Sequence, residues 1–101
     1  MMRSWIVATY KSNDARKVER NLLNQKFDYC LPKITTKKIN SNPKVEVLFP
    51  GYIFVNTSFE NYSALKYTIG IRNIIKFGDN IPCISDYEIK AMQMAVEASI
   101  I

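Results

Sequence analysis

Residues 48–55 read LFPGYIFV, and these eight positions contain no charged and no amide side chain. Pro50 has no backbone N–H to donate to a sheet, so we predict that it is the first residue of a strand. Gly51 allows a bend or a close contact just inside that strand. The stretch therefore predicts a strand over 52–55 with apolar side chains on both sides.

The side chains of this strand alternate between the two faces of a sheet. Tyr52 and Phe54 share one face, and Ile53 and Val55 share the other. A single layer of helices would cover one pair and leave the other bare, and a bare aromatic pair would be a binding surface. The alternative is that helices cover both faces, as they do for many apolar strands.

Two patterns near the start of the chain predict a strand followed by a helix. Residues 5–10 (WIVATY) are β-formers that are bulky on both sides, which is typical of a central strand. Residues 14–26 repeat apolar groups at Ala15, Val18 and Leu22, which is the spacing of an amphipathic helix.

The order of the remaining segments predicts the fold class. Strands are expected over 27–31 and 71–77, and a lysine-bearing β-hairpin over 34–47, with its tip at 40–43, where every residue is a turn former. Together with the helices, the order is β-α-β, hairpin, β-α-β-α. It predicts an α+β fold, a ferredoxin-like sandwich with a mostly antiparallel four-stranded sheet, flanking helices and a basic hairpin.

Two sequences of the capping-box type predict helix starts. Residues 57–60 (TSFE) are expected to begin a short helix, and residues 85–88 (SDYE) are expected to begin the last helix. In the last helix, Ile89, Met92 and Val96 are predicted to face inward.

Length and composition limit the classes of function. A chain of 101 residues, 48% of them hydrophobic, suits one compact domain, which we place over 1–101. The apolar runs are far shorter than the roughly 20 residues that cross a bilayer, so we expect no membrane contact and a cytoplasmic protein. Histidine is absent, and Cys30 and Cys83 are far apart, which argues against a metal site. We therefore predict no catalytic residue, no cofactor and no small-molecule substrate.

The charge is basic and unevenly distributed. The net charge of +5 favours a polyanionic neighbour. Residues 31–47 hold several lysines against the single acid Glu46: Lys33, Lys37, Lys38 and Lys44. The outer face of the predicted first helix is basic and rich in amides: Lys17, Arg20, Asn21 and Asn24. A solvated helix face is the alternative explanation for that pattern.

Several motifs occur together in one order: WIV, YCLP, the basic hairpin, LFPGYIFV, GIRNIIKFG and PCISDYEI. This succession resembles the N-terminal (NGN) domain of the NusG family of transcription elongation factors, from about Ser4 to Met94. The short hairpin and YCLP are similar to specialised paralogues of RfaH or UpxY type. Nothing in the chain resembles the C-terminal KOW domain of the family, so the sequence is expected to be either an excised domain or a shortened paralogue.

The resemblance implies a function on RNA polymerase. The family domain bridges the central cleft beside the upstream edge of the transcription bubble and suppresses pausing or termination. Its apolar sheet face receives the clamp helices of the largest polymerase subunit. The matching positions here are Val7, Thr9, Phe49, Pro50, Tyr52, Phe54 and Ile89. Thr9 departs from the aromatic residue often found at its position.

Two further contacts follow from the same resemblance. The polymerase gate loop is expected to meet Asn61, Tyr62 and Ser63. The non-template DNA strand is expected to meet the basic face of the first helix: Lys17, Arg20, Asn21, Asn24 and Gln25.

A second family shares part of LFPGYIFV. The third strand of the RNA-recognition motif carries outward aromatics that stack on bases, and Tyr52 and Phe54 fit that pattern. However, Pro50 stands where the motif has Lys or Arg, Ile53 fills a Gly or Ala position, and Thr57 replaces the last aromatic. A domain that binds single-stranded RNA is therefore the alternative function.

Overall fold

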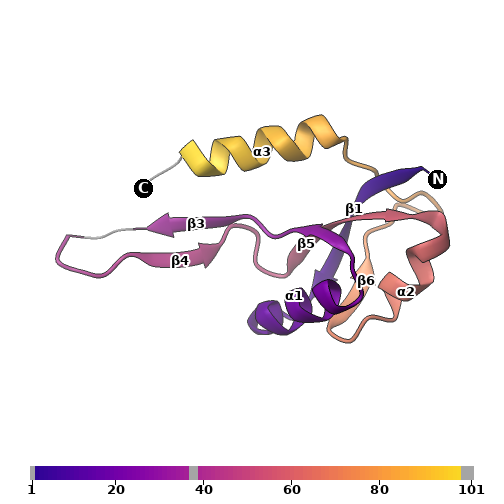
Figure 1. Cartoon of the computed structure of the whole chain (residues 1–101), viewed down its shortest axis with the longest axis horizontal. Helices are drawn as coiled ribbons and strands as arrows, with labels where there is room; N and C mark the ends of the chain where they lie inside the picture. The colour runs from indigo at the N-terminus through magenta and orange to yellow at the C-terminus, as the bar shows by residue number, and fades with distance from the viewer. Residues whose placement is uncertain (1, 37–38, 99–101) are drawn as a thin grey trace.

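The computed structural model describes residues 2–36 and 39–98, and four of its strands form an antiparallel sheet in the order β2-β5-β1-β6 (Figure 1). These strands are β1 (Arg3–Tyr10), β2 (Asp28–Cys30), β5 (Tyr52–Ser58) and β6 (Ile71–Ile74). The central place of β1 confirms the prediction from its bulky side chains. β6 ends at Ile74 rather than at Phe77, and Phe77 instead forms an isolated bridge with Asn80. The predicted α+β, ferredoxin-like order is confirmed.

Helices α1 (Ala15–Asn24) and α2 (Tyr62–Lys66) lie on one side of the sheet, and α3 (Asp86–Ala98) lies on the other (Figure 1). Two 3₁₀ turns, η1 (Ser12–Asp14) and η2 (Phe59–Asn61), precede α1 and α2. The side under α1 and α2, which we call the core face, buries the main hydrophobic cluster. Its members are Ile6, Ala8, Tyr10, Val18, Leu22, Leu31, Ile53, Val55, Leu65 and Ile74.

A smaller cluster attaches α3 to the opposite side of the sheet. Trp5, Cys30 and Ile89 are buried there. The indole Nε1 of Trp5 also donates a hydrogen bond of 2.7 Å to Oδ1 of Asp86, the first residue of α3. The start of α3 is therefore held over β1.

The two predicted capping boxes have different outcomes. At the start of α3, the Ser85 hydroxyl accepts from the backbone N–H of Glu88 and donates to its carboxylate, both at 3.1 Å, which confirms the prediction. The prediction for 57–60 is wrong. Thr57 lies inside β5, where it pairs with Ser4, and its hydroxyl donates to the backbone oxygen of Ser58. Strand pairing therefore removes Thr57 from a helix-capping position.

The predicted place of Pro50 also needs correction. Pro50 and Gly51 form a turn before β5, closed by a hydrogen bond of 3.1 Å from Tyr52 N–H to the oxygen of Phe49. Gly51 has φ of +89°, which a type II turn requires at this position. The oxygen of Gly51 accepts from Tyr10 N–H at 3.0 Å. The turn thus fixes where the aromatic strand starts.

The predicted hairpin forms a separate two-stranded sheet of β3 (Lys33–Thr36) and β4 (Lys44–Val47). It extends from the body of the molecule along its longest dimension of 49 Å (Figure 1). Asn40 adopts φ of 66° in the turn region, as its predicted place at the tip suggests. Lys37 and Lys38, two of the predicted basic residues, lie outside the described residues.

Candidate functional site

The side of the sheet opposite the core face carries the aromatic pair of β5. Ile53 and Val55 have no exposed surface, whereas Tyr52 is 47% exposed. Phe49, in the preceding turn, is 41% exposed, and its ring meets Phe54 edge-to-face at 6.3 Å between centroids. We call the surface formed by Phe49, Tyr52, Phe54 and their neighbours on β1 the aromatic face.

Strand β1 supplies the neighbouring part of this face. Val7 and Thr9 pair directly with Phe54 and Tyr52 in the antiparallel register, and both are half-buried. The Thr9 hydroxyl donates to the backbone oxygen of Asn73 on β6 at 3.4 Å. With the exposed Pro50, six of the seven residues predicted to bind the clamp helices thus lie together.

Ile89, the seventh, faces inward, as the spacing of the last helix predicted, so it lies apart from the exposed side chains of the other six. It is 3% exposed and packs in the cluster with Trp5 and Cys30, with Phe54 against that cluster. Since α3 presents Ile89 inward, toward the sheet, this residue packs in the cluster that Phe54 contacts and offers almost no surface to a partner. Burial also raises the pKa of the Cys30 thiol, against a lowering hydrogen bond from Gln93.

Two cations beside the aromatic face escaped the sequence prediction. Lys11 and Arg72 line a shallow hollow of about 520 Å³ that also includes Thr9 and Tyr52. They come from segments far apart in the chain, and the antiparallel pairing of β1 with β6 brings them together. No local sequence pattern connects Lys11 with Arg72, so the sequence could not predict that they lie together.

The α1 side chains that are predicted to contact DNA form two groups. Asn21 Nδ2 donates to the backbone oxygen of Ile69 at 2.8 Å, and Gln25 Nε2 donates to the Thr68 hydroxyl at 2.9 Å. These two amides hold the connection between α2 and β6 against α1. Gly70 permits this approach, since a Cβ there would lie 2.8 Å from Val18 Cγ2. The remaining predicted DNA contacts are exposed: Lys17, Arg20 and Asn24.

The predicted gate-loop residues lie at the junction of η2 and α2. Asn61 and Ser63 are exposed, and Tyr62 is half-buried against the core cluster. The Lys76 ammonium lies 5.6 Å from the centre of the Tyr62 ring, a cation–π contact. This group therefore presents polar atoms to solvent from a backbone that the core holds in place.

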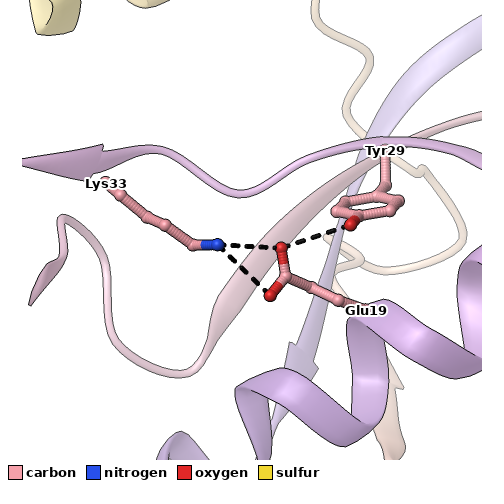
Figure 2. Close-up of polar contacts among 3 residues, drawn as sticks. All are labelled: Glu19, Tyr29 and Lys33. Carbon is pink, nitrogen blue, oxygen red and sulfur yellow. Dashed lines mark hydrogen bonds and ion pairs between the residues drawn. The ribbon is translucent and has the colours of Figure 1, made fainter. Parts of the chain in front are cut away.

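A polar network joins α1 to the base of the hairpin (Figure 2). Lys33 Nζ lies 3.1 and 3.3 Å from the two carboxylate oxygens of Glu19, and the Tyr29 hydroxyl donates to the same carboxylate at 3.2 Å. Burial, and then the negative charge of Glu19, raises the pKa of Tyr29. These contacts attach the base of the hairpin to α1.

The described residues also bear on metal sites and on membrane spans. Within 2–36 and 39–98, no three His, Cys, Asp or Glu side chains lie close enough together to hold a metal ion. None of the helices described there has both the length and the apolar character that a bilayer span requires.

The structure defines a ferredoxin-like α+β module with an exposed aromatic face. The family model described as "Transcription termination factor nusG" matches residues 3–93. The chain belongs to the NusG family, which consists of non-enzymatic transcription factors, as the sequence predicted.

A solved structure shows the same fold. It is a structure of Thermotoga maritima NusG, described as "Domain interaction in Thermotoga maritima NusG", with a TM-score of 0.64 and 19% identity. The match covers 91% of this chain and 56% of that chain, so the protein spans a little over half the length of this relative. No curated protein matches the chain.

Proposed function

We propose that this domain belongs to an elongation and antitermination factor that binds across the cleft of RNA polymerase and suppresses pausing or termination. The observation that carries the proposal is the difference between the two sides of β5. Ile53 and Val55 have no exposed surface, while Tyr52 on the other side is 47% exposed. Family membership provides the class of partner.

The aromatic face is the proposed site for the clamp helices of the largest polymerase subunit. Tyr52 and Phe49 present large, rigid apolar groups next to half-buried Val7, and aromatic groups of this kind dominate many protein interfaces. Lys11 and Arg72 stand beside them, so a helix tip with acidic side chains at its edge fits the charge.

The gate loop is proposed to bind at Asn61, Tyr62 and Ser63. This group follows the end of β5, whereas Tyr52 is at its start, so the sheet separates the two polymerase contacts. A rigid domain that binds both sides of the cleft stabilises the polymerase conformation in which both sites are correctly spaced. Its effect is then a coupling free energy, with no covalent step.

The exposed cations of α1 are the proposed contact with the non-template DNA strand. Lys17 and Arg20 are free of hydrogen bonds to the α2–β6 connection, unlike Asn21 and Gln25 on the same helix. Phosphate contacts need accessible cations, which favours Lys17, Arg20 and Asn24 within the predicted set. In this proposal the domain acts in the cytoplasm as a specialised paralogue of RfaH or UpxY type.

Binding of single-stranded RNA through the same face is not favoured. Helix α3 covers the part of the sheet where β1 and β5 bring Trp5 and Phe54 together, and Trp5 is 8% exposed. The RNA-recognition motif needs this central area open, because its bases stack there.

A pausing assay tests the proposal. Purified RNA polymerase is halted and released on a template with a strong pause site, with and without the domain. We expect the domain to shorten the pause, Tyr52→Ala to lose the effect, and a zinc chelator at constant magnesium to leave it intact. An unchanged pause with the folded wild-type domain, or an unchanged effect of Tyr52→Ala, contradicts the proposal.

A further inference from the structure

A cavity of about 310 Å³ lies at the end of β5 away from Tyr52, where the end of α1 meets the start of α2. Its volume is at the lower end of the range for small-molecule pockets. The lining consists of Arg3, Gln25, Lys26, Phe27, Asn56, Thr57, Ser58, Asn61 and Ala64. Of these, Gln25 and Asn61 also belong to the contacts proposed above, so most of the cavity has no assigned role.

The charge of the lining favours an anion. The described residues around the cavity include two cations, Arg3 and Lys26, and no carboxylate. Asp28 lies opposite Asn56 on β2 and outside the lining. Arg3 donates to the backbone oxygen of Asn56 at a long 3.4 Å, which places the guanidinium beside the cavity wall.

Two buried polar groups of the lining lack partners. Ser58 is 4% exposed, and among the described residues neither its hydroxyl nor Oδ1 of Asn56 has a hydrogen-bond partner. Ser58 stands at the N-cap of η2, yet its hydroxyl does not cap that turn. Buried polar groups are usually paired, so these two are candidates for pairing with a ligand. The unpaired Asn56 Oδ1 can only accept and therefore needs an N–H or O–H of the ligand, whereas the Ser58 hydroxyl can donate or accept.

Lys26 lines the cavity from an unusual backbone conformation. Its φ is 63°, and it follows α1 at the position where glycine is favoured. Backbone bonds of 2.9 Å from Lys26 N–H to Leu23 and from Phe27 N–H to Leu22 complete this helix end. A lysine in this conformation is strained relative to glycine, and such strain is concentrated at functional positions.

We propose that this cavity binds a small phosphorylated ligand. Lys26 and Arg3 bind the phosphoryl oxygens, because two cations match a group that carries nearly two negative charges at neutral pH. The Ser58 hydroxyl donates to the phosphoryl group, Asn56 Oδ1 accepts from an N–H or O–H of the organic part, and the rest of the cavity holds that part. The site is separate from the aromatic face, and binding there requires no polymerase.

A nuclear magnetic resonance titration tests the site on the whole chain. The ¹⁵N-labelled protein is titrated at constant ionic strength with adenosine monophosphate, with inorganic phosphate and with adenosine. We expect saturable changes at the backbone amides of Lys26, Asn56 and Ser58 with the monophosphate, and none with adenosine. Saturation by inorganic phosphate at the same amides also supports the proposal. Equal binding of adenosine, or no saturable change with either phosphate, overturns it.

Three variants distinguish specific binding in this cavity from nonspecific attraction of an anion to a basic protein. Lys26→Gly removes a cation and suits the positive φ, so this variant should stay folded. Lys26→Gly and Arg3→Gln should each weaken monophosphate binding about tenfold, the loss expected for one charge-assisted hydrogen bond. Lys90→Gln removes an exposed cation from α3 and should leave binding unchanged. A similar loss in all three variants contradicts the proposal.

Discussion

The two sides of β5 differ in how helices cover them. On the core face, α1 and α2 bury Ile53 and Val55 completely. On the other side, α3 covers the sheet near Trp5 and Ile89 and leaves Tyr52 47% exposed. One strand therefore serves both folding and, in our proposal, binding. The comparison predicts that substitutions on the core face change stability, whereas substitutions on the open part of the aromatic face change affinity.

The largest effect is expected from truncation on the core face. Ile53→Ala should lower the free energy of unfolding by about 3 kcal/mol and the melting temperature by roughly 10 °C or more, because it leaves a cavity in a fully buried site. Ile39→Ala is the matched control, since Ile39 is 93% exposed and its truncation should change stability by under about 0.5 kcal/mol. Equal melting temperatures for the two variants would show that the core face is not the hydrophobic core of the fold.

The next effect concerns DNA binding by α1. Lys17→Glu combined with Arg20→Glu should weaken binding to an assembled elongation complex about tenfold at low salt, and the loss should shrink as salt rises. Affinity for core polymerase without DNA should barely change. Lys90→Glu on α3 is the control for a single charge reversal outside α1, to be compared with Lys17→Glu and Arg20→Glu made one at a time. If the double variant loses core polymerase equally, α1 contacts protein instead.

A smaller effect distinguishes two amides on the same helix. Asn21→Ala should cost about 1 kcal/mol of stability, because Asn21 donates to Ile69 at 2.8 Å. Asn24→Ala should cost almost none, since Asn24 is exposed. Urea unfolding measures both. If Asn21→Ala keeps wild-type stability but binds DNA more weakly, Asn21 contacts DNA instead of supporting the fold.

The smallest effect is a dependence of stability on alkaline pH. The pKa of Tyr29 is raised in the folded state by burial first and by Glu19 second. A raised folded-state pKa gives stability that is present below the ordinary tyrosine pKa of about 10 and is lost as pH rises through the folded value. Tyr29→Phe should therefore lose stability less steeply than wild type above about pH 10 in urea unfolding. Identical slopes would contradict the pKa shift.

Much of the fold could be predicted because its signals are local. Alternation in 52–55 separated Ile53 and Val55 from Tyr52 and Phe54, and the spacing of Val18 and Leu22 identified the buried side of α1. The sequences at 57–60 and 85–88 look alike, but the first lies at the end of a paired strand. Pairing depends on distant residues, so the local pattern could not separate the two.

The site could be predicted less completely, because it depends on contacts between distant segments. The packing of α3 on Trp5 covers part of the sheet side that carries Tyr52, and the pairing of β1 with β6 adds Lys11 and Arg72 beside Tyr52. The sequence of α1 likewise gave no sign that Asn21 binds a loop about two-thirds of the way along the chain.

The most direct test of the account pairs melting temperature with affinity for a clamp-helix fragment of the largest polymerase subunit, measured on Tyr52→Ala and Val55→Ala. Tyr52→Ala should stay folded with a nearly unchanged melting temperature and lose about 2 kcal/mol of binding. Val55→Ala should melt lower and, while folded, bind as wild type does, because Val55 has no exposed surface. Phe54→Ala should affect both quantities, since Phe54 packs against the α3 cluster. If Tyr52→Ala melts the domain, or stays folded and binds the fragment with wild-type affinity, the aromatic face is not the binding site.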